Sequence, residues 1–82
     1  MNNRRTNVQI MADILRLGPA TKTETSYKLN IRRPQLDKYL DFLVKRGFLE
    51  LSSGSKTVIY LPTQRGRELL NCIDRVTQVL KF

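Results

Sequence analysis

The sequence contains no histidine, no tryptophan and only one cysteine, Cys72, in 82 residues. A single cysteine excludes a disulfide within the chain, and the lack of histidine and of a cysteine cluster excludes the usual zinc-ligand sets. A nucleophile would also lack the imidazole base that most often activates it. Cys72 lies in an apolar helical pattern, where burial keeps a thiol protonated and inert. We therefore expect no enzyme activity, no catalytic residue, no metal and no cofactor.

Long hydrophobic runs are missing too. No apolar segment approaches the ~18 residues of a membrane span, and no signal-peptide pattern opens the chain. A lone free cysteine is compatible with a reducing cytosol. The four glycines are scattered and form no phosphate-binding loop, so no small-molecule ligand is evident. We expect a cytoplasmic, nucleoid-associated protein that does not contact a membrane.

Acidic residues are scarce relative to basic ones. Seven Asp and Glu stand against 15 Lys and Arg, which gives a net charge of +8. A small domain with a pI near 10.3 is typical of a surface that binds phosphate groups. The alternative is that the charge only keeps the protein soluble. The concentration of basic residues in particular segments favours the first interpretation.

The chain opens with a polar, basic segment, residues 1–6, that we expect to be disordered. A first helix follows, capped by Thr6 or Asn7 and running to about Leu17. Gly18–Pro19 then stops this helix, because glycine suits the left-handed cap and proline cannot continue a helix.

A second, short helix begins after one of two candidate caps, Thr21 or Thr23. It ends at Asn30, since asparagine tolerates a left-handed backbone. Tyr27 and Leu29 are its expected inward residues.

A third helix begins at Pro34, where the missing proline N–H costs nothing, and Gly47 closes it. Its buried stripe, flanked by Tyr39, consists of Leu36, Leu40, Leu43 and Val44. A tight turn joins the second helix to the third. This order predicts a helix-turn-helix, in which the later helix enters the major groove of DNA.

Four residues near the start of the third helix are the candidate DNA contacts: Arg32, Arg33, Gln35 and Lys38. Residues at this place reach base edges, and arginine can bond guanine O6 and N7 together. The alternative is a solvated helical face that binds nothing. Two acids, Asp37 and Asp41, lie near the same face. Either carboxylate could accept a hydrogen bond from a cytosine amine, but we expect surface ion pairs instead. Asp41 and Lys45 are four residues apart, which is the correct spacing for an ion pair on a helix.

Two β-prone runs, Phe48–Leu51 and Val58–Leu61, flank a polar loop of six residues and predict a β-hairpin. After a helix-turn-helix, such a hairpin is a wing. Its tip offers hydroxyls, backbone N–H groups and one lysine, which suit phosphate oxygens. The candidate contacts are Ser53, Ser55 and Lys56.

Thr63 caps a final helix that runs from Gln64 to about Lys81. An apolar stripe with spacings of 4, 3 and 4 residues follows it, the pattern of a coiled-coil seam: Leu69, Ile73, Val76 and Leu80. The alternative is an amphipathic helix that folds back on its own core. Because a domain this small has a marginal core and lacks disulfides and metal, we predict a homodimer through these residues.

The segment Thr21–Glu50 resembles a family of archaeal winged-helix proteins in which a helix-turn-helix is joined to a C-terminal dimerising helix. The family pattern of Asn-Leu, a polar pair, Leu-x-x-Tyr-Leu-x-x-Leu and Gly-Leu is matched by Lys28–Ile31, Leu36, Tyr39–Leu40, Leu43 and Gly47–Leu49. The later segment Tyr60–Leu70 is similar to the family's Tyr-x-Leu-Thr-x-x-Gly-Arg-x-Leu ending. The resemblance covers residues 8–80 or so.

This resemblance implies binding to double-stranded DNA, as a chromatin-type protein or a transcription regulator. It also implies a homodimer joined by antiparallel pairing of the last helix. We thus predict an α+β, mainly α, fold: a winged helix-turn-helix of three helices and a β-hairpin wing over residues 7–62, then a dimerisation helix over residues 63–82. The main alternative is a protein-interaction module on the same scaffold. RNA binding is less favoured, because exposed aromatics for base stacking are scarce.

Overall fold

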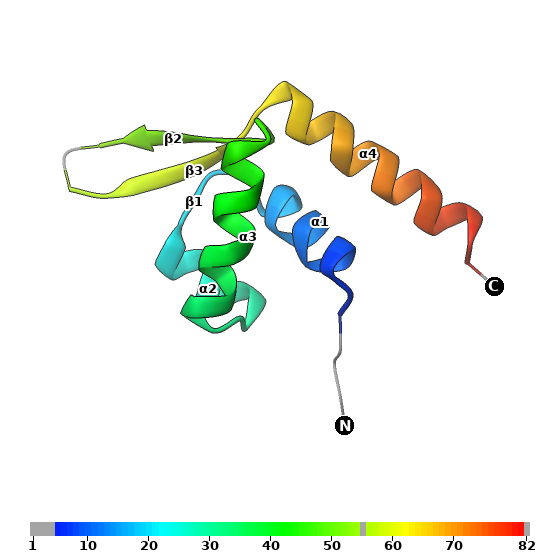
Figure 1. Cartoon of the computed structure of the whole chain (residues 1–82), viewed down its shortest axis with the longest axis horizontal. Helices are drawn as coiled ribbons and strands as arrows, with labels where there is room; N and C mark the ends of the chain where they lie inside the picture. The colour runs from blue at the N-terminus through cyan, green and yellow to red at the C-terminus, as the bar shows by residue number, and fades with distance from the viewer. Residues whose placement is uncertain (1–4, 55, 82) are drawn as a thin grey trace.

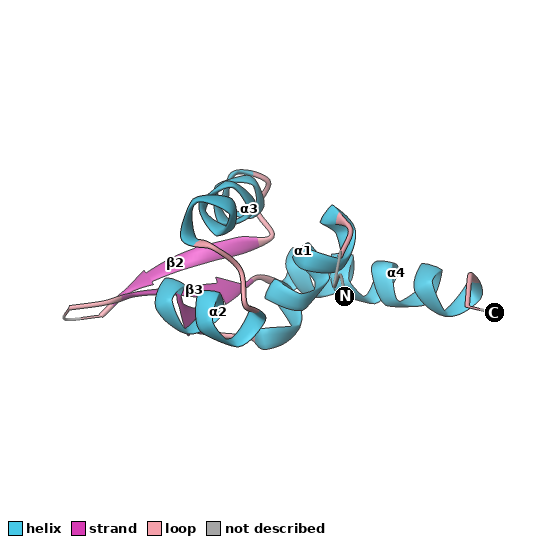
Figure 2. Ribbon diagram, turned by 90° about the horizontal axis from the view of Figure 1, so that it is seen from below, coloured by secondary structure: helices cyan, strands magenta, loops and turns pink. Residues whose placement is uncertain are grey.

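The structure, a computed structural model, describes residues 5–54 and 56–81. Its elements follow the chain in the order α1 (Asn7–Leu17), β1 (Ala20–Thr21), α2 (Lys22–Leu29), α3 (Arg33–Lys45), β2 (Leu49–Ser53), β3 (Val58–Pro62) and α4 (Gln64–Val79). The first three helices, β1 and the ends of β2 and β3 nearest the helices form one body. The β2–β3 hairpin projects from it at one end and α4 at the other (Figure 1, Figure 2). The predicted α+β architecture of helix-turn-helix, wing and final helix is confirmed.

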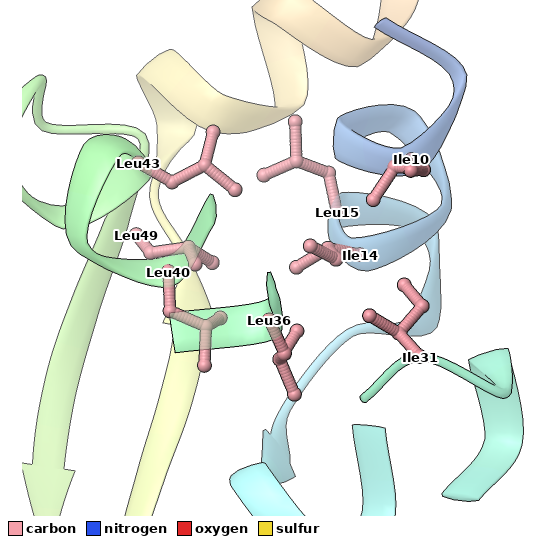
Figure 3. Packing of buried hydrophobic residues seen from close by; sticks show 8 residues of the cluster. All are labelled: Ile10, Ile14, Leu15, Ile31, Leu36, Leu40, Leu43 and Leu49. Atoms are coloured by element: carbon pink, nitrogen blue, oxygen red, sulfur yellow. The ribbon is translucent and has the colours of Figure 1, made fainter. Parts of the chain in front are cut away.

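Eight apolar side chains form the core (Figure 3): Ile10, Ile14, Leu15, Ile31, Leu36, Leu40, Leu43 and Leu49. The three leucines from α3 are each at most 2% exposed, which confirms three of the four residues of the predicted stripe, whereas the fourth, Val44, is half-buried. Val44 and Tyr39 pack against the cluster from its edge. Burying one leucine side chain stabilises the fold by about 1.5–3 kcal/mol. Strong packing on one face thus fixes α3 and leaves its opposite face to solvent.

Local hydrogen bonds set the ends of the first two helices. Thr6 and Gln9 form a capping box at the start of α1, and Thr21 and Glu24 form another at the start of α2. Each box satisfies backbone N–H groups that the helix would leave unpaired. Asn30 ends α2 in the left-handed conformation, with φ of 55°, as predicted. Of the two candidate caps for α2, Thr21 is the one used.

Two expectations in this region are wrong in part. Tyr27 is 85% exposed and does not point inward. Thr25 is buried in its place, and its hydroxyl donates to the Thr21 carbonyl at 2.8 Å. Thr25 and Leu29 lie one turn apart on the inner face, so a residue two positions from each must point away. Arg5, expected to be disordered, forms an ion pair with Asp13 at 2.8 Å; residues 1–4 of that segment lie outside the described residues.

The sheet has three antiparallel strands in the order β1-β3-β2. The sequence does not predict β1, because two residues are too few to show alternation; this strand pairs with β3. The wing loop is also shorter than expected. Since β2 continues to Ser53, the loop is residues 54–57, closed by a hydrogen bond of 2.9 Å from Gly54 N–H to the Thr57 carbonyl.

The start of α4 packs tightly on the segment that follows α3. The Thr63 backbone N–H donates to the Phe48 carbonyl at 3.0 Å, and the Thr63 hydroxyl donates to the Gly47 carbonyl at 2.6 Å. The same hydroxyl accepts from Gly66 N–H at 3.0 Å and so caps α4, as predicted. Gly66 is buried, and a Cβ built on it would lie 2.1 Å from the Phe48 carbonyl oxygen. Only glycine allows this approach.

Replacing Gly66 by alanine should therefore destabilise the fold. A Cβ at 2.1 Å from the Phe48 carbonyl oxygen forces α4 away from the segment that follows α3, and overpacking of this kind costs about 1–3 kcal/mol or more. Urea unfolding of Gly66→Ala measures the loss. The matched control is Gly54→Ala, whose Cβ would meet the Thr57 carbonyl at an ordinary 3.7 Å. Equal stability of the two variants would contradict the packing described for α4.

Candidate nucleic-acid interface

All four residues predicted to contact DNA from α3 are exposed: Arg32, Arg33, Gln35 and Lys38. Arg32 is the N-cap residue, and the helix begins at Arg33, one position earlier than predicted. No side chain caps this end of the helix. Its first backbone N–H groups are therefore available to water or to a ligand.

Arg33 points away from the side of α3 that carries Gln35 and Lys38. Its Nη1 lies 3.3 Å from the Thr23 hydroxyl oxygen of α2. It lines a cleft between the start of α2, the start of α3 and the hairpin, which we call the wing cleft. The lining residues are Thr21, Lys22, Thr23, Arg33, Leu51, Thr57, Val58 and Tyr60.

Gln35 and Lys38 line a second cleft, between α3 and α1. Tyr39 of α3 and Asn7 of α1 form part of the same lining, and the Tyr39 hydroxyl donates to Asn7 Oδ1 at 2.5 Å. The structure therefore brings Gln35 and Lys38 together and separates both from Arg33. The sequence cannot show this division, because it depends on where α1 and α2 pack.

The two acids near α3 differ in their partners. Asp37 Oδ1 is closed to solvent and lies 2.7 Å from Lys22 Nζ. This interaction with Asp37 raises the pKa of Lys22 above its ordinary value, while desolvation and, less strongly, the charge of nearby Arg33 act in the opposite direction. The ion pair expected between Asp41 and Lys45 is not formed. Both side chains are exposed, and in water the attraction of such a pair barely offsets the entropy lost in holding it.

The wing presents both polar and apolar groups. Ser53 and Lys56 are exposed near its tip, as predicted, while Ser55 lies outside the described residues. Leu51 and Val58 are 54% and 43% exposed, and both line the wing cleft. Their place in the two β-prone runs predicts that they lie on strands but not that they line a cleft. Alternation along the strands indicates that they share a face, but no local pattern shows that α2 lies opposite them.

The four residues predicted to form the dimer lie along one stripe of α4 that the chain covers only at its beginning. Leu69 and Ile73 are half-buried, whereas Val76 is 57% and Leu80 65% exposed. The second half of α4 extends away from the body (Figure 1). Cys72 is exposed, so its expected burial is wrong for the single chain. An ion pair between Arg16 and Asp74 fastens α4 to α1.

Three packed helices, a hairpin beside the third and an exposed basic helix start define a helix-turn-helix protein with a wing. A family model described as "Winged helix-turn-helix" matches residues 4–81. The chain belongs to this winged helix-turn-helix family. No curated protein matches the chain.

Solved structures share the fold. Sso10a-2, a DNA-binding protein from Sulfolobus solfataricus, is 32% identical, with a TM-score of 0.83 over 92% of this chain and 81% of that chain. The transcriptional repressor BigR from Xylella fastidiosa is 18% identical, with a TM-score of 0.72 over 92% of this chain and 76% of its own. A MarR variant from E. coli, solved with operator DNA, is 19% identical, with a TM-score of 0.73 over 87% of this chain and 53% of that chain. The chain thus spans about half the length of MarR.

Two further findings concern the described residues alone. None of their helices is long and apolar enough to cross a membrane. Residues 5–54 and 56–81 also contain no group of three or more side chains suited to hold a metal ion.

The capping box that starts α2, beside Thr23, predicts a pH-dependent stability. The Thr21 backbone N–H donates to the Glu24 carboxylate at 2.9 Å and lowers the pKa of Glu24 below its ordinary 4.5. Since the folded pKa is the lower one, this stabilisation is present above about pH 4.5 and is lost as the pH falls through the folded value. Glu24→Gln should therefore melt below the wild type at neutral pH, with a difference that shrinks in acid. The control is Glu50→Gln, an exposed carboxylate on β2; a Glu24→Gln difference that stays constant with pH would contradict the assignment.

Proposed function

We propose that this chain is a non-enzymatic protein that binds duplex DNA, as a transcription regulator or an architectural, chromatin-type protein of the cytoplasm. The observation that carries the proposal is the exposed start of α3, which has no side-chain cap and carries Arg32 and Arg33, with Arg33 beside the wing. In helix-turn-helix proteins this helix enters the major groove. The likeness to Sso10a-2, described as a DNA-binding protein, supports the same function.

The proposal gives a role to each candidate DNA contact on α3 and on the wing. From α3, Arg32, Gln35 and Lys38 contact base edges or the phosphates beside them, and Arg33 contributes from the wing side. At the wing tip, Ser53 and Lys56 contact phosphates, with Ser55 as a further candidate. The net charge of +8 supports this arrangement, because each neutralised phosphate releases counterions and makes binding stronger at low salt.

We also propose a homodimer formed through Leu69, Ile73, Val76 and Leu80. α4 has 16 residues, which makes it ~24 Å long at 1.5 Å per residue. Its second half exposes Val76, Val79 and Leu80 to solvent. A second copy would cover these side chains, and each Å² of apolar surface removed from water stabilises the pair by ~25 cal/mol before the cost of association. A two-fold pair would also present two α3 helices to one duplex.

The DNA proposal predicts a steep dependence of affinity on salt. Titrations with specific and random duplexes at several salt concentrations measure it. Lys56→Ala should weaken all duplexes alike and reduce the log–log salt slope by ~1, because it removes one phosphate contact. The matched control is Lys81→Ala, the same charge change on an exposed residue beyond α4. Affinity that does not respond to salt would favour the protein-interaction module, and loss confined to one sequence would mean that Lys56 reads bases.

The dimer proposal predicts that Ile73→Asp together with Val76→Asp gives monomers, because two carboxylates would be buried in an apolar seam. These monomers should bind DNA far more weakly. A suitable control is Asn71→Asp with Gln78→Asp, which adds the same charge on the opposite side of α4. Sedimentation decides the question. A wild-type species of 9.6 kDa at tens of micromolar would end the dimer hypothesis.

A further inference from the structure

We infer that the wing cleft holds the sugar–phosphate backbone of one DNA strand, and that Arg33 contacts a phosphate there rather than a base edge. The inference rests on the proposed function and refines it. It separates two adjacent arginines that look equivalent in sequence, and it adds Leu51 and Val58 to the DNA-contacting surface.

The Arg33 side chain points toward the wing cleft and away from the other residues of α3 that are candidate DNA contacts. Residues 33 and 35 are about 200° apart around a helix, and the structure places them in different clefts. Arg33 Nη1 is held 3.3 Å from the Thr23 hydroxyl oxygen, toward α2 and the hairpin. A guanidinium held there is poorly placed to reach the base edges that Gln35 and Lys38 would meet. Backbone contacts, in contrast, come from the flanks of the recognition helix and from the elements beside it.

The wing cleft contains one cation that no carboxylate of the described residues balances. Lys22 is a lining residue, but its ammonium is balanced by Asp37 at 2.7 Å. Arg33 has no carboxylate partner within residues 5–54 and 56–81. Its hydrogen bond to Thr23 uses one of five guanidinium N–H groups and leaves the others for a ligand. A phosphate fits this need, because its oxygens accept charge-assisted hydrogen bonds from a guanidinium in pairs.

The wing cleft also has an apolar wall. Leu51 and Val58 stand on the face of the hairpin that is turned toward the cleft, and both are about half exposed. A site that bound only a small anion would not need exposed aliphatic side chains. A DNA strand alternates charged phosphates with carbon-rich deoxyribose rings. The wing cleft matches this alternation, with a cation on one wall and two aliphatic side chains on the other.

The test compares the salt dependence of duplex binding for Arg33→Ala, Arg33→Lys and Arg32→Ala. Loss of one phosphate contact should lower the log–log slope of Arg33→Ala by ~0.9, which amounts to about eightfold weaker binding at 0.1 M salt. The loss should be equal for preferred and random duplexes. Arg33→Lys should retain the wild-type slope, because a point charge serves a phosphate but replaces a two-pronged base contact poorly. Arg32→Ala is the comparison variant, because Arg32 is exposed and adjacent but not among the residues lining the wing cleft. Its loss should fall mainly on preferred duplexes, as a base contact requires.

A second pair of variants tests the apolar wall. Leu51→Asp places a carboxylate inside the wing cleft, whereas Ser52→Asp places one on the opposite face of the same strand. Both positions are exposed, so both variants should keep the wild-type unfolding temperature. Leu51→Asp should weaken binding to every duplex at least tenfold more than Ser52→Asp, because it repels the phosphates directly.

The outcomes separate this inference from the proposed function. If the wild type fails to bind duplex DNA at low salt, the proposed function fails and the inference fails with it. If the wild type binds, but Arg33→Ala keeps the wild-type slope or loses affinity only for preferred sequences, the inference alone is overturned. Equal effects of Leu51→Asp and Ser52→Asp on binding would likewise show that the DNA strand does not lie in the wing cleft.

Discussion

The relative positions of α3, the hairpin and α4 depend on one close approach, that of Gly66 to the Phe48 carbonyl. Phe48 follows α3 and leads into β2, while Gly66 lies in the first turn of α4. The Thr63 hydroxyl and backbone N–H bind both partners of this contact. Because the interaction joins backbone to backbone, no side-chain rotation can relieve it, and α4 leaves the body in a fixed direction. Any molecule that α4 binds is thereby placed at a defined angle to α3.

Charges are distributed unevenly around this frame. Asp13 and Asp74 pair with Arg5 and Arg16 where α1 meets α4. Asp37 pairs with Lys22 beside the wing cleft. Arg32, Lys38 and Lys56 take part in no ion pair within the described residues, and all three are exposed on α3 or the wing. The start of α3 and the wing therefore carry positive charge that no acidic side chain of the described residues balances, and such charge attracts a polyanion.

Much of the fold can be predicted from the sequence because local chemistry decides it. The cap Thr21, the left-handed Asn30 and the leucine stripe of α3 depend on residues within one or two turns of one another. The missed features depend on distant partners. β1 exists only because β3 lies beside it, and the exposure of Tyr27 follows from which face of α2 meets the core. The wing loop is shorter than its composition suggests, since pairing with β3 extends β2 through polar residues that have little strand preference of their own.

The candidate site follows the same division. Its residue types and their exposure are predicted from sequence, because a basic helix start beside a proline is a local feature. The directions of Arg33 and Gln35 are not, since they depend on α2 and α1 respectively. Cys72 shows what an apolar pattern cannot predict, since this residue was expected to be buried but is exposed. An apolar helical pattern predicts that a residue will be covered, but it does not say whether the cover comes from the same chain.

The direct passage from β1 into α2 has a consequence for how the wing cleft meets a ligand. Thr21 pairs with Ile59 of β3 and also caps α2, so no linker separates the two walls of the cleft. The walls belong to one hydrogen-bonded unit and cannot move apart unless β1 detaches from β3. A ligand of matching width would therefore bind without rearranging α2 relative to β3, and with a correspondingly small loss of conformational entropy. A wider one would have to break the pairing of β1 with β3, so the spacing of the walls itself limits the width of any ligand that the wing cleft can accept.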